Sequence, residues 1–235
     1  MNTTISGIYA KTRIYGKKEG VLVDGKNDFI KRYVRDKRVL HVGCTDYPIT
    51  QERINAHKLL HGELSEYASY LMGIDLSEDG IGCMKKHGFE NVHVMDAEKM
   101  DINEKFDVIV AGDVVEHLSN PGAFLKEAYR LLDPGGSLVI TVPSAYALRH
   151  SLQYWLFGNE IVHKDHCYYF SPKTLAALCN RFGFLPTTAR YISRKARILP
   201  LLRGFFWAFF YNIHLHFLMI FHKREEVESD AYYEI

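Results

Sequence analysis

Acidic residues follow three successive apolar runs of the chain. Asp75 follows "YLMGI", Asp96 follows "VHVM" and Asp113 follows "VIVAG". An ionised carboxylate only accepts hydrogen bonds, which suits it to the hydroxyl groups of a ribose and to the amino group of an adenine. We therefore expect an adenosine-containing ligand, with Asp75 accepting from both ribose hydroxyls and Asp96 accepting from the adenine amino group.

A glycine-poor turn follows the first apolar run, in "VLHVGCTDYP". Cofactors with a diphosphate need the close backbone approach of a Gly-x-Gly-x-x-Gly turn, and this turn has only Gly43. A ligand with adenosine and no phosphate tolerates the bulkier Cys44, Thr45 and Asp46. S-adenosylmethionine is such a ligand, and its cationic sulfonium and ammonium groups favour a nearby carboxylate. A nicotinamide dinucleotide is disfavoured.

Histidines supply candidate bases. His117 follows the fourth apolar run, and His163 and His166 lie in "VHKDHCYYF". Methyl transfer from a sulfonium to a hydroxyl is helped by a base, and an imidazole titrates near neutral pH. We expect His117 or His166 to be catalytic. The alternative for each is a hydrogen-bonded structural histidine.

The stretch "DVVEH" also has the spacing of a metal site. Asp113, Glu116 and His117, with a distant histidine, could converge on one hard divalent cation. The alternative is that Glu116 caps or braces a helix. We expect the alternative and assign no metal.

Short apolar runs alternate with amphipathic helical segments, which is the pattern of βαβ units in a parallel sheet. Ligands of such sheets sit beyond the carboxyl ends of the strands, where the acidic residues and the turn at Gly43 are expected. Strands are predicted over 38–42, 70–74, 92–95, 107–111, 137–142, 185–192 and 215–222, and helices over 28–35, 54–68, 78–87, 121–132 and 172–182. Asn120 and Ser171 are predicted to cap the starts of the last two helices.

Length and composition favour one cytoplasmic domain. The 235 residues are 47% hydrophobic, which is enough for one core. A formal net charge of +1 provides no overall field to attract nucleic acid. The four cysteines form no Cys-x-x-Cys pair, and the first residues lack the apolar core of a signal peptide.

One apolar segment, 199–221, is long enough to span a membrane. Arg203, Asn212 and two histidines within it would be costly in hydrocarbon. We expect a helix followed by a core strand. A peripheral membrane contact through 199–212 and a true span are the alternatives.

Five stretches together resemble a known family: "VLHVGC", "GIDLS", "DAEKM", "FDVIVAGDVVEHLSNPGAFLKEAYRLLDPGGSLVITVPS" and "DHCYYFSPKTLAALCNRFGF". Over about 37–184 the chain resembles the class I S-adenosylmethionine-dependent methyltransferases, especially their ubiquinone-biosynthesis-like branch. The resemblance implies an α/β fold with a seven-stranded, doubly wound, mostly parallel sheet whose last strand is antiparallel. It also implies S-adenosylmethionine as cofactor, bound by Gly43, Cys44, Asp75, Leu76, Asp96, Ala97 and Gly112.

The chain departs from the family pattern at two positions of the first turn. His41 stands where these enzymes carry an acid, and Thr45 stands in place of the second glycine. Both departures bear on how the methionine end is bound.

The resemblance divides the chain into a cap segment at 1–36, a methyltransferase domain at 37–223 and a polar tail at 224–235. The long connection at 144–170 is expected to be a lid over the substrate. We expect an O-methyltransferase acting on a small-molecule acceptor, which is a sugar, a quinone or a lipid-linked metabolite. The alternative is a degenerate cofactor-binding domain that serves as a membrane-associated or partner-binding subunit. The oligomeric state stays open.

Overall fold

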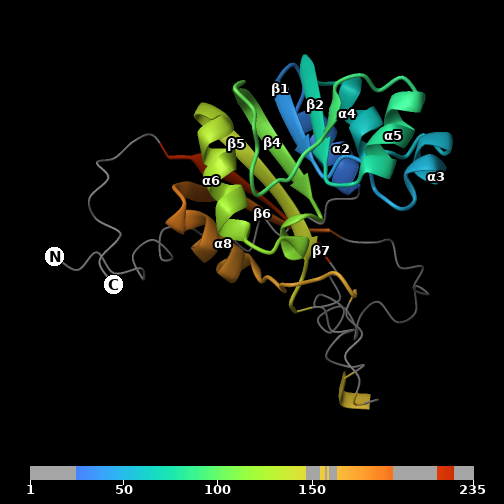
Figure 1. Ribbon diagram of the computed structural model, residues 1–235. Coiled ribbons are helices and arrows are strands. Elements are labelled where there is room, and N and C mark those ends of the chain that lie inside the picture. Colours follow the sequence, from blue (N-terminus) through green and yellow to red (C-terminus); the bar gives the residue numbers. More distant parts are fainter. Residues whose placement is uncertain (1–24, 147–153, 157, 159–162, 193–215, 225–235) are drawn as a thin grey trace, which may run out of the picture.

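A computed structural model describes residues 25–146, 154–156, 158, 163–192 and 216–224 (Figure 1). Its seven strands form one sheet in the order β3-β2-β1-β4-β5-β7-β6, and β7 runs antiparallel to both of its neighbours. The predicted sheet with an antiparallel last strand is confirmed. The strands are β1 (Arg38–Val42), β2 (Tyr70–Asp75), β3 (Val92–Val94), β4 (Phe106–Gly112), β5 (Leu132–Pro143), β6 (Phe184–Ile192) and β7 (His216–Lys223). The helices are α2 (Lys26–Tyr33), α3 (Thr50–Asn55), α4 (Leu60–Ser65), α5 (Glu78–Lys86), the 3-10 turn η1 (Val115–His117), α6 (Pro121–Leu131) and α8 (Pro172–Arg181).

Helices cover both faces of the sheet, with α6 and α8 on one side and α2, α4 and α5 on the other (Figure 1). Alternate residues of β4 explain this arrangement. Val108 and Val110 pack with Ile30 of α2, whereas Ile109 packs with Phe124 of α6. Successive side chains of a strand point to opposite faces, so a continuously apolar strand such as β4 needs cover on both.

The starts of α6 and α8 follow the predicted capping signals. The Asn120 side chain accepts a hydrogen bond from Ala123 N, and Ser171 forms a reciprocal capping box with Thr174. These bonds satisfy backbone amides that have no partner within the helix.

The helix predicted over 54–68 is wrong, because the structure has two short helices there, α3 and α4. His57 adopts a left-handed φ of 52° between them. Leu59 packs with Cys44 beneath α5, whereas Leu60 and Leu64 pack against the sheet. The break allows these adjacent leucines to be buried in two separate clusters.

The end of segment 199–221, from residue 216 onward, belongs to a core strand, as predicted. In β7 the residues from Phe217 to Phe221 are all buried. The predicted helix at 199–212 lies outside the described residues, as does the membrane contact assigned to it. No helix in the described part of the chain has both the length and the apolar character to cross a bilayer.

Helix α2 belongs to the predicted cap segment 1–36 and packs directly on the sheet. Its residue Ile30 and the following Val34 are completely buried with Val39 of β1. This packing places Lys26, at the start of α2, within reach of the carboxyl end of β4.

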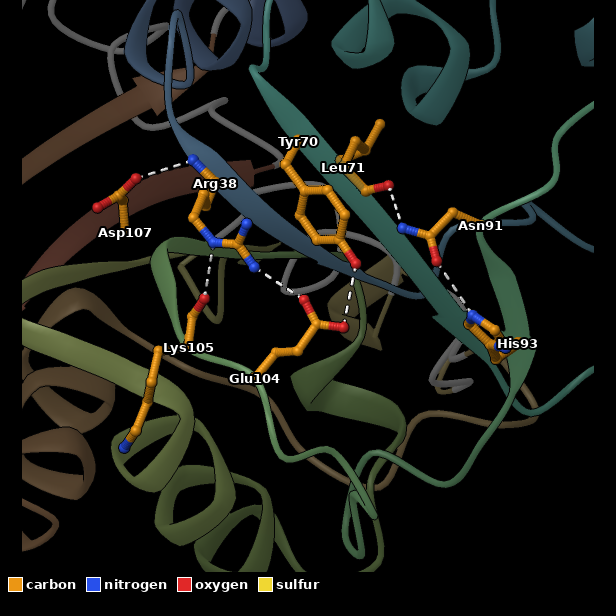
Figure 2. Close-up of polar contacts among 8 residues, drawn as sticks. All are labelled: Arg38, Tyr70, Leu71, Asn91, His93, Glu104, Lys105 and Asp107. Carbon is orange, nitrogen blue, oxygen red and sulfur yellow. Dashed lines mark hydrogen bonds and ion pairs between the residues drawn. The ribbon is translucent and has the colours of Figure 1, made fainter.

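A polar network ties together the amino ends of the strands, at the opposite edge of the sheet (Figure 2). Arg38 Nη2 donates to Glu104 Oε2 at 2.8 Å, and the Tyr70 hydroxyl donates to Glu104 Oε1 at 3.1 Å. Arg38 N donates to Asp107 Oδ2 at 2.8 Å. These bonds hold the beginnings of β1, β2 and β4, and leave the carboxyl edge to the ligand.

Two buried histidines stack beneath the carboxyl edge. The rings of His41 and His61 lie 5.5 Å apart with an interplanar angle of 9°. A side chain on Gly73 would place its Cβ 2.6 Å from His61 Cε1, so glycine is needed there. Burial lowers the pKa of His61 to about 4, and burial, His61 and the charge of Lys26 hold the pKa of His41 well below its usual range. His41, which replaces the family acid, is therefore a neutral core residue.

We expect the folded protein to lose stability as the pH falls from 6.5 towards about 4, because only the unfolded chain protonates His61 freely there. The lowered pKa of His61 corresponds to a loss of about 3 kcal/mol in the free energy of unfolding across this pH range. Denaturant unfolding across this range measures it, and His61→Gln is expected to flatten the slope.

Glu116 acts in the opposite direction, since its raised pKa favours the folded state at low pH. Both wild type and His61→Gln contain Glu116, so subtracting one stability curve from the other removes the contribution of Glu116. His93→Gln, at an exposed position, is the control. Parallel stability curves for wild type and His61→Gln would contradict the prediction.

Candidate active site

The turn after β1 has the backbone conformation that only glycine adopts without strain. Gly43 has a φ of 73°, and a Cβ on it would lie 2.4 Å from Val114 Cγ2. Gly43 N donates to Ile74 O at 2.9 Å, which holds the turn against β2. Burial raises the pKa of the neighbouring Cys44 thiol, so this cysteine stays a neutral thiol and contributes packing.

Asp75 accepts three hydrogen bonds from the protein. Thr45 N and Thr45 Oγ1 donate to Asp75 Oδ2 at 3.0 and 2.8 Å, and Ser77 N donates to Oδ1 at 2.9 Å. A carboxylate offers about four lone-pair sites, which leaves one, on Oδ1. One acceptor site of Asp75 is therefore left for a ligand, whereas direct bonds to both ribose hydroxyls, as expected from the sequence, would use two.

Thr45, which the sequence analysis treated only as a departure from the family pattern, holds the Asp75 carboxylate. It is fully buried, and its hydroxyl and amide both hold the Asp75 carboxylate. The signal in the sequence was a hydroxyl side chain where the family has a loop glycine. Only the structure shows that this hydroxyl bonds to Asp75, at the end of the next strand.

The residues after β2 and β3 form a mixed polar and apolar surface. Leu76 is 72% exposed, which is unusual for a leucine beside a buried strand. Asp96 is exposed, and its Oδ1 accepts from Glu98 N at 2.8 Å. Met95 N donates to Asp75 O at 2.9 Å, which joins the two strand ends. Ala97 packs into the core, so its side chain faces away from this surface.

The turn after β4 holds an ion pair. Asp113 has a left-handed φ of 56°, and its N donates to Thr141 O at 2.8 Å. Its Oδ2 lies 2.5 Å from Lys26 Nζ, and its Oδ1 accepts from Thr141 Oγ1 at 3.1 Å. Sequence reasoning missed Lys26, because nothing local relates it to a residue 87 positions away.

Glu116 lies beneath this turn and is 1% exposed. Neither carboxyl oxygen has a hydrogen-bond partner among the residues that the structure describes. Burial, with a smaller contribution from Asp113, raises the pKa of Glu116 to about 8. The carboxyl is therefore mostly protonated at neutral pH.

The two predicted catalytic histidines lie together, and a third joins them. The ring centroids of His117 and His166 are 4.6 Å apart, and those of His163 and His166 are 5.1 Å apart. The long connection is anchored here, because Cys167 N and Tyr168 N donate to Glu116 O at 2.8 and 3.2 Å. Burial, with His117 and His163, lowers the pKa of His166.

Three of the expected cofactor residues also meet at one edge of the sheet. Val42 of β1 pairs with Ile74 on one side and with Ala111 on the other. The next residues in each strand, Gly43, Asp75 and Gly112, are therefore neighbours. This edge offers a carboxylate that can accept hydrogen bonds and the exposed apolar side chain of Leu76, next to a turn without a phosphate-binding loop. These features fit S-adenosylmethionine, which carries adenosine and no phosphate.

Comparison with known proteins agrees. A family model described as a methyltransferase domain matches residues 17–188, which is more than half of the chain. The ubiquinone biosynthesis O-methyltransferase of Bradyrhizobium diazoefficiens is 31% identical over 109 residues, which are 44% of this chain and 39% of that relative. The chain thus spans well under two thirds of that relative's length.

Two solved structures share the fold. The S-adenosylmethionine-dependent methyltransferase of Mesorhizobium loti matches with a TM-score of 0.55 and 15% identity, over 85% of this chain and 99% of that one. The 1,6-didemethyltoxoflavin-N1-methyltransferase of Burkholderia thailandensis, with bound 1,6-didemethyltoxoflavin and S-adenosylhomocysteine, matches with a TM-score of 0.56 and 18% identity, over 85% of this chain and 76% of that one. The fold, the motifs and the family match lead to one conclusion: the chain belongs to the methyltransferase domain family, in the S-adenosylmethionine-dependent class I, and its cofactor is S-adenosylmethionine.

Proposed function

We propose that this protein transfers a methyl group to an oxygen of a small-molecule acceptor. The observation that supports this most directly is the placement of Gly43, Asp75 and Gly112 along one sheet edge, with His117 and His166 gathered in the connections that follow the same edge.

S-adenosylmethionine, when bound, supplies a methyl group on a sulfonium: the acceptor oxygen bonds to its carbon, the carbon–sulfur bond breaks, the electron pair stays on sulfur, and the hydroxyl proton passes to a base. Asp75 would accept from a ribose hydroxyl of the bound cofactor, and Asp96 would accept from its adenine amino group. The turns at Gly43 and Gly112 let the backbone approach the methionine end. Much of the acceleration then comes from positioning the reactants.

His117 is well placed to act as the base. Its Nδ1 lies 3.1 Å from Asp165 O. A neutral imidazole that donates from Nδ1 to this carbonyl carries its lone pair on Nε2, where it can accept a proton. His166 is the second candidate, because its Nδ1 has no hydrogen-bond partner within the described residues.

The connection 144–170 is proposed to form the acceptor pocket. Ser144 pairs with Phe170, so the connection leaves and returns at the same place. Tyr146, Tyr154 and Trp155 are 60%, 63% and 80% exposed within it. Exposed aromatic faces suit a ring-shaped acceptor such as a sugar or a quinone, and they also suit a lipid-linked metabolite. The names of the relatives, which refer to ubiquinone and to toxoflavin, agree with a small ring-shaped acceptor.

S-adenosylhomocysteine is expected to raise the melting temperature of the protein, and NAD is not, because the turn at Gly43 lacks a diphosphate cradle. Ligand at about 100 times its dissociation constant stabilises the folded state by about 2.7 kcal/mol. Thermal unfolding with each ligand measures the effect. Stabilisation by NAD alone would overturn the assignment.

Turnover separates an enzyme from a degenerate cofactor-binding subunit. The protein is incubated with S-adenosylmethionine and a panel of sugars, quinols and lipid-linked phenols, and S-adenosylhomocysteine release is followed. Cofactor binding with no release for any acceptor would favour the subunit.

A further inference from the structure

Three imidazoles from two separate segments gather beside the methionine end of the site. His117 belongs to η1, and His163 and His166 belong to the long connection. One candidate ligand nitrogen from each residue lies within 4.8 Å of the other two. Within the described ranges, the metal-ligating side chains that come together in this way are these three and not Asp113, Glu116 and His117.

The carboxylates of the "DVVEH" stretch have other environments. Asp113 forms an ion pair with Lys26 and accepts from Thr141. Glu116 is buried beneath the turn. The donors that remain are nitrogens, and imidazole ligands suit zinc and other first-row transition metals better than magnesium.

The contacts around the cluster resemble the supporting shell of a metal site. His117 Nδ1 is 3.1 Å from Asp165 O, an arrangement that leaves Nε2 as the free ligand atom. The Asp165 carboxylate oxygen Oδ2 lies 3.8 Å from His163 Nδ1 and brings a negative charge beside a cation. His166 Nδ1 is a buried atom with no hydrogen-bond partner within the described residues. A buried polar atom of this kind is usually satisfied by a ligand, an ion or water.

We propose that His117, His163 and His166 bind one divalent transition-metal ion of the zinc type. Nitrogens about 2.0 Å from a tetrahedral ion are about 3.3 Å apart. The ligand atoms of the three histidines lie within 4.8 Å of one another, so the imidazoles would move closer together when a metal binds. Three protein ligands leave a fourth position open, as in catalytic zinc sites.

The open position suits the acceptor oxygen. A divalent cation lowers the pKa of a hydroxyl bound to it, so a bound acceptor would release its proton to solvent water at neutral pH. This use of the metal rests on the proposed function, whereas metal binding itself does not.

Metal binding is tested on the full chain after removal of metal by a chelator. Zn²⁺ is added in competition with a chromophoric chelator, and Co²⁺ is added to follow its absorption spectrum. Wild type is expected to bind one equivalent of each. His163→Ala is expected to lower the Zn²⁺ affinity by more than about 100-fold, since even the loss of supporting contacts costs 10- to 100-fold.

His163 is a suitable position because its side chain is 57% exposed, so the substitution removes little packing. His93→Ala is the matched control, since this histidine is exposed on β3 and lies outside the cluster. It should bind metal as wild type does. Absence of stoichiometric binding by wild type, or unchanged affinity in His163→Ala, would overturn the proposal.

Calorimetry with S-adenosylhomocysteine on the same samples distinguishes the two proposals. Cofactor binding without metal binding would reject the proposed metal site and leave the proposed methyltransferase function intact. Metal binding that is lost in His163→Ala, in a protein that binds no cofactor, supports the metal site and removes the proposed function.

Discussion

One of the two variants His117→Ala and His166→Ala is expected to lower methyl transfer turnover by about 10²- to 10⁴-fold, namely the one that removes the base. The two rings lie 4.6 Å apart, in connections that follow the proposed cofactor edge, so either one is a candidate to contact the proposed acceptor. Affinity for S-adenosylhomocysteine should stay nearly unchanged, because neither side chain is among the proposed cofactor residues. Turnover with saturating cofactor and calorimetry measure the two effects separately.

The variants also separate a base from a metal ligand. Loss of turnover in His163→Ala as well, together with loss of metal, assigns the histidines to a metal site. Loss confined to His117→Ala or His166→Ala assigns a base. His93→Ala controls for removal of a surface histidine. Normal turnover by both single variants and by the double variant would exclude a base and a catalytic metal at these residues, and the chelator titration would still decide whether they bind a metal.

Asp75→Ala is expected to weaken cofactor binding strongly. A charge-assisted hydrogen bond to a ribose hydroxyl contributes roughly 1.5–3 kcal/mol, which is about 10- to 150-fold in affinity. The substitution also removes the acceptor of Thr45 N, Thr45 Oγ1 and Ser77 N, so the turn loses its anchor as well. Titration calorimetry with S-adenosylhomocysteine measures the loss.

Thr45→Val separates the two contributions of Asp75. It removes the hydroxyl donor at 2.8 Å and keeps the backbone bond at 3.0 Å and the carboxylate. We expect a smaller loss of affinity than in Asp75→Ala. Equal losses would mean that Asp75 acts through the turn alone, and wild-type affinity in Asp75→Ala would contradict the ribose assignment.

Local patterns in the sequence determined most of the sheet and the cofactor edge. All seven strands were predicted, because apolar runs and turn residues are readable along the chain. Six have ends within one residue of the prediction, whereas β5 begins five residues earlier than predicted. Asn120 and Ser171 marked helix starts, since capping involves residues three apart. Asp75 and Asp96 could be proposed as cofactor residues because the carboxyl ends of parallel strands share one edge.

Tertiary structure alone decided which distant residues meet. Lys26 pairs with Asp113 across 87 positions because α2 packs on the sheet, and no local signal connects the two. His163 joins His117 because the connection after β5 is anchored to Glu116 O. The break at His57 and the hydrogen bonds from Thr45 to Asp75 likewise follow from packing between elements. Periodicity and capping are properties of neighbouring residues, whereas these contacts depend on how the whole core closes.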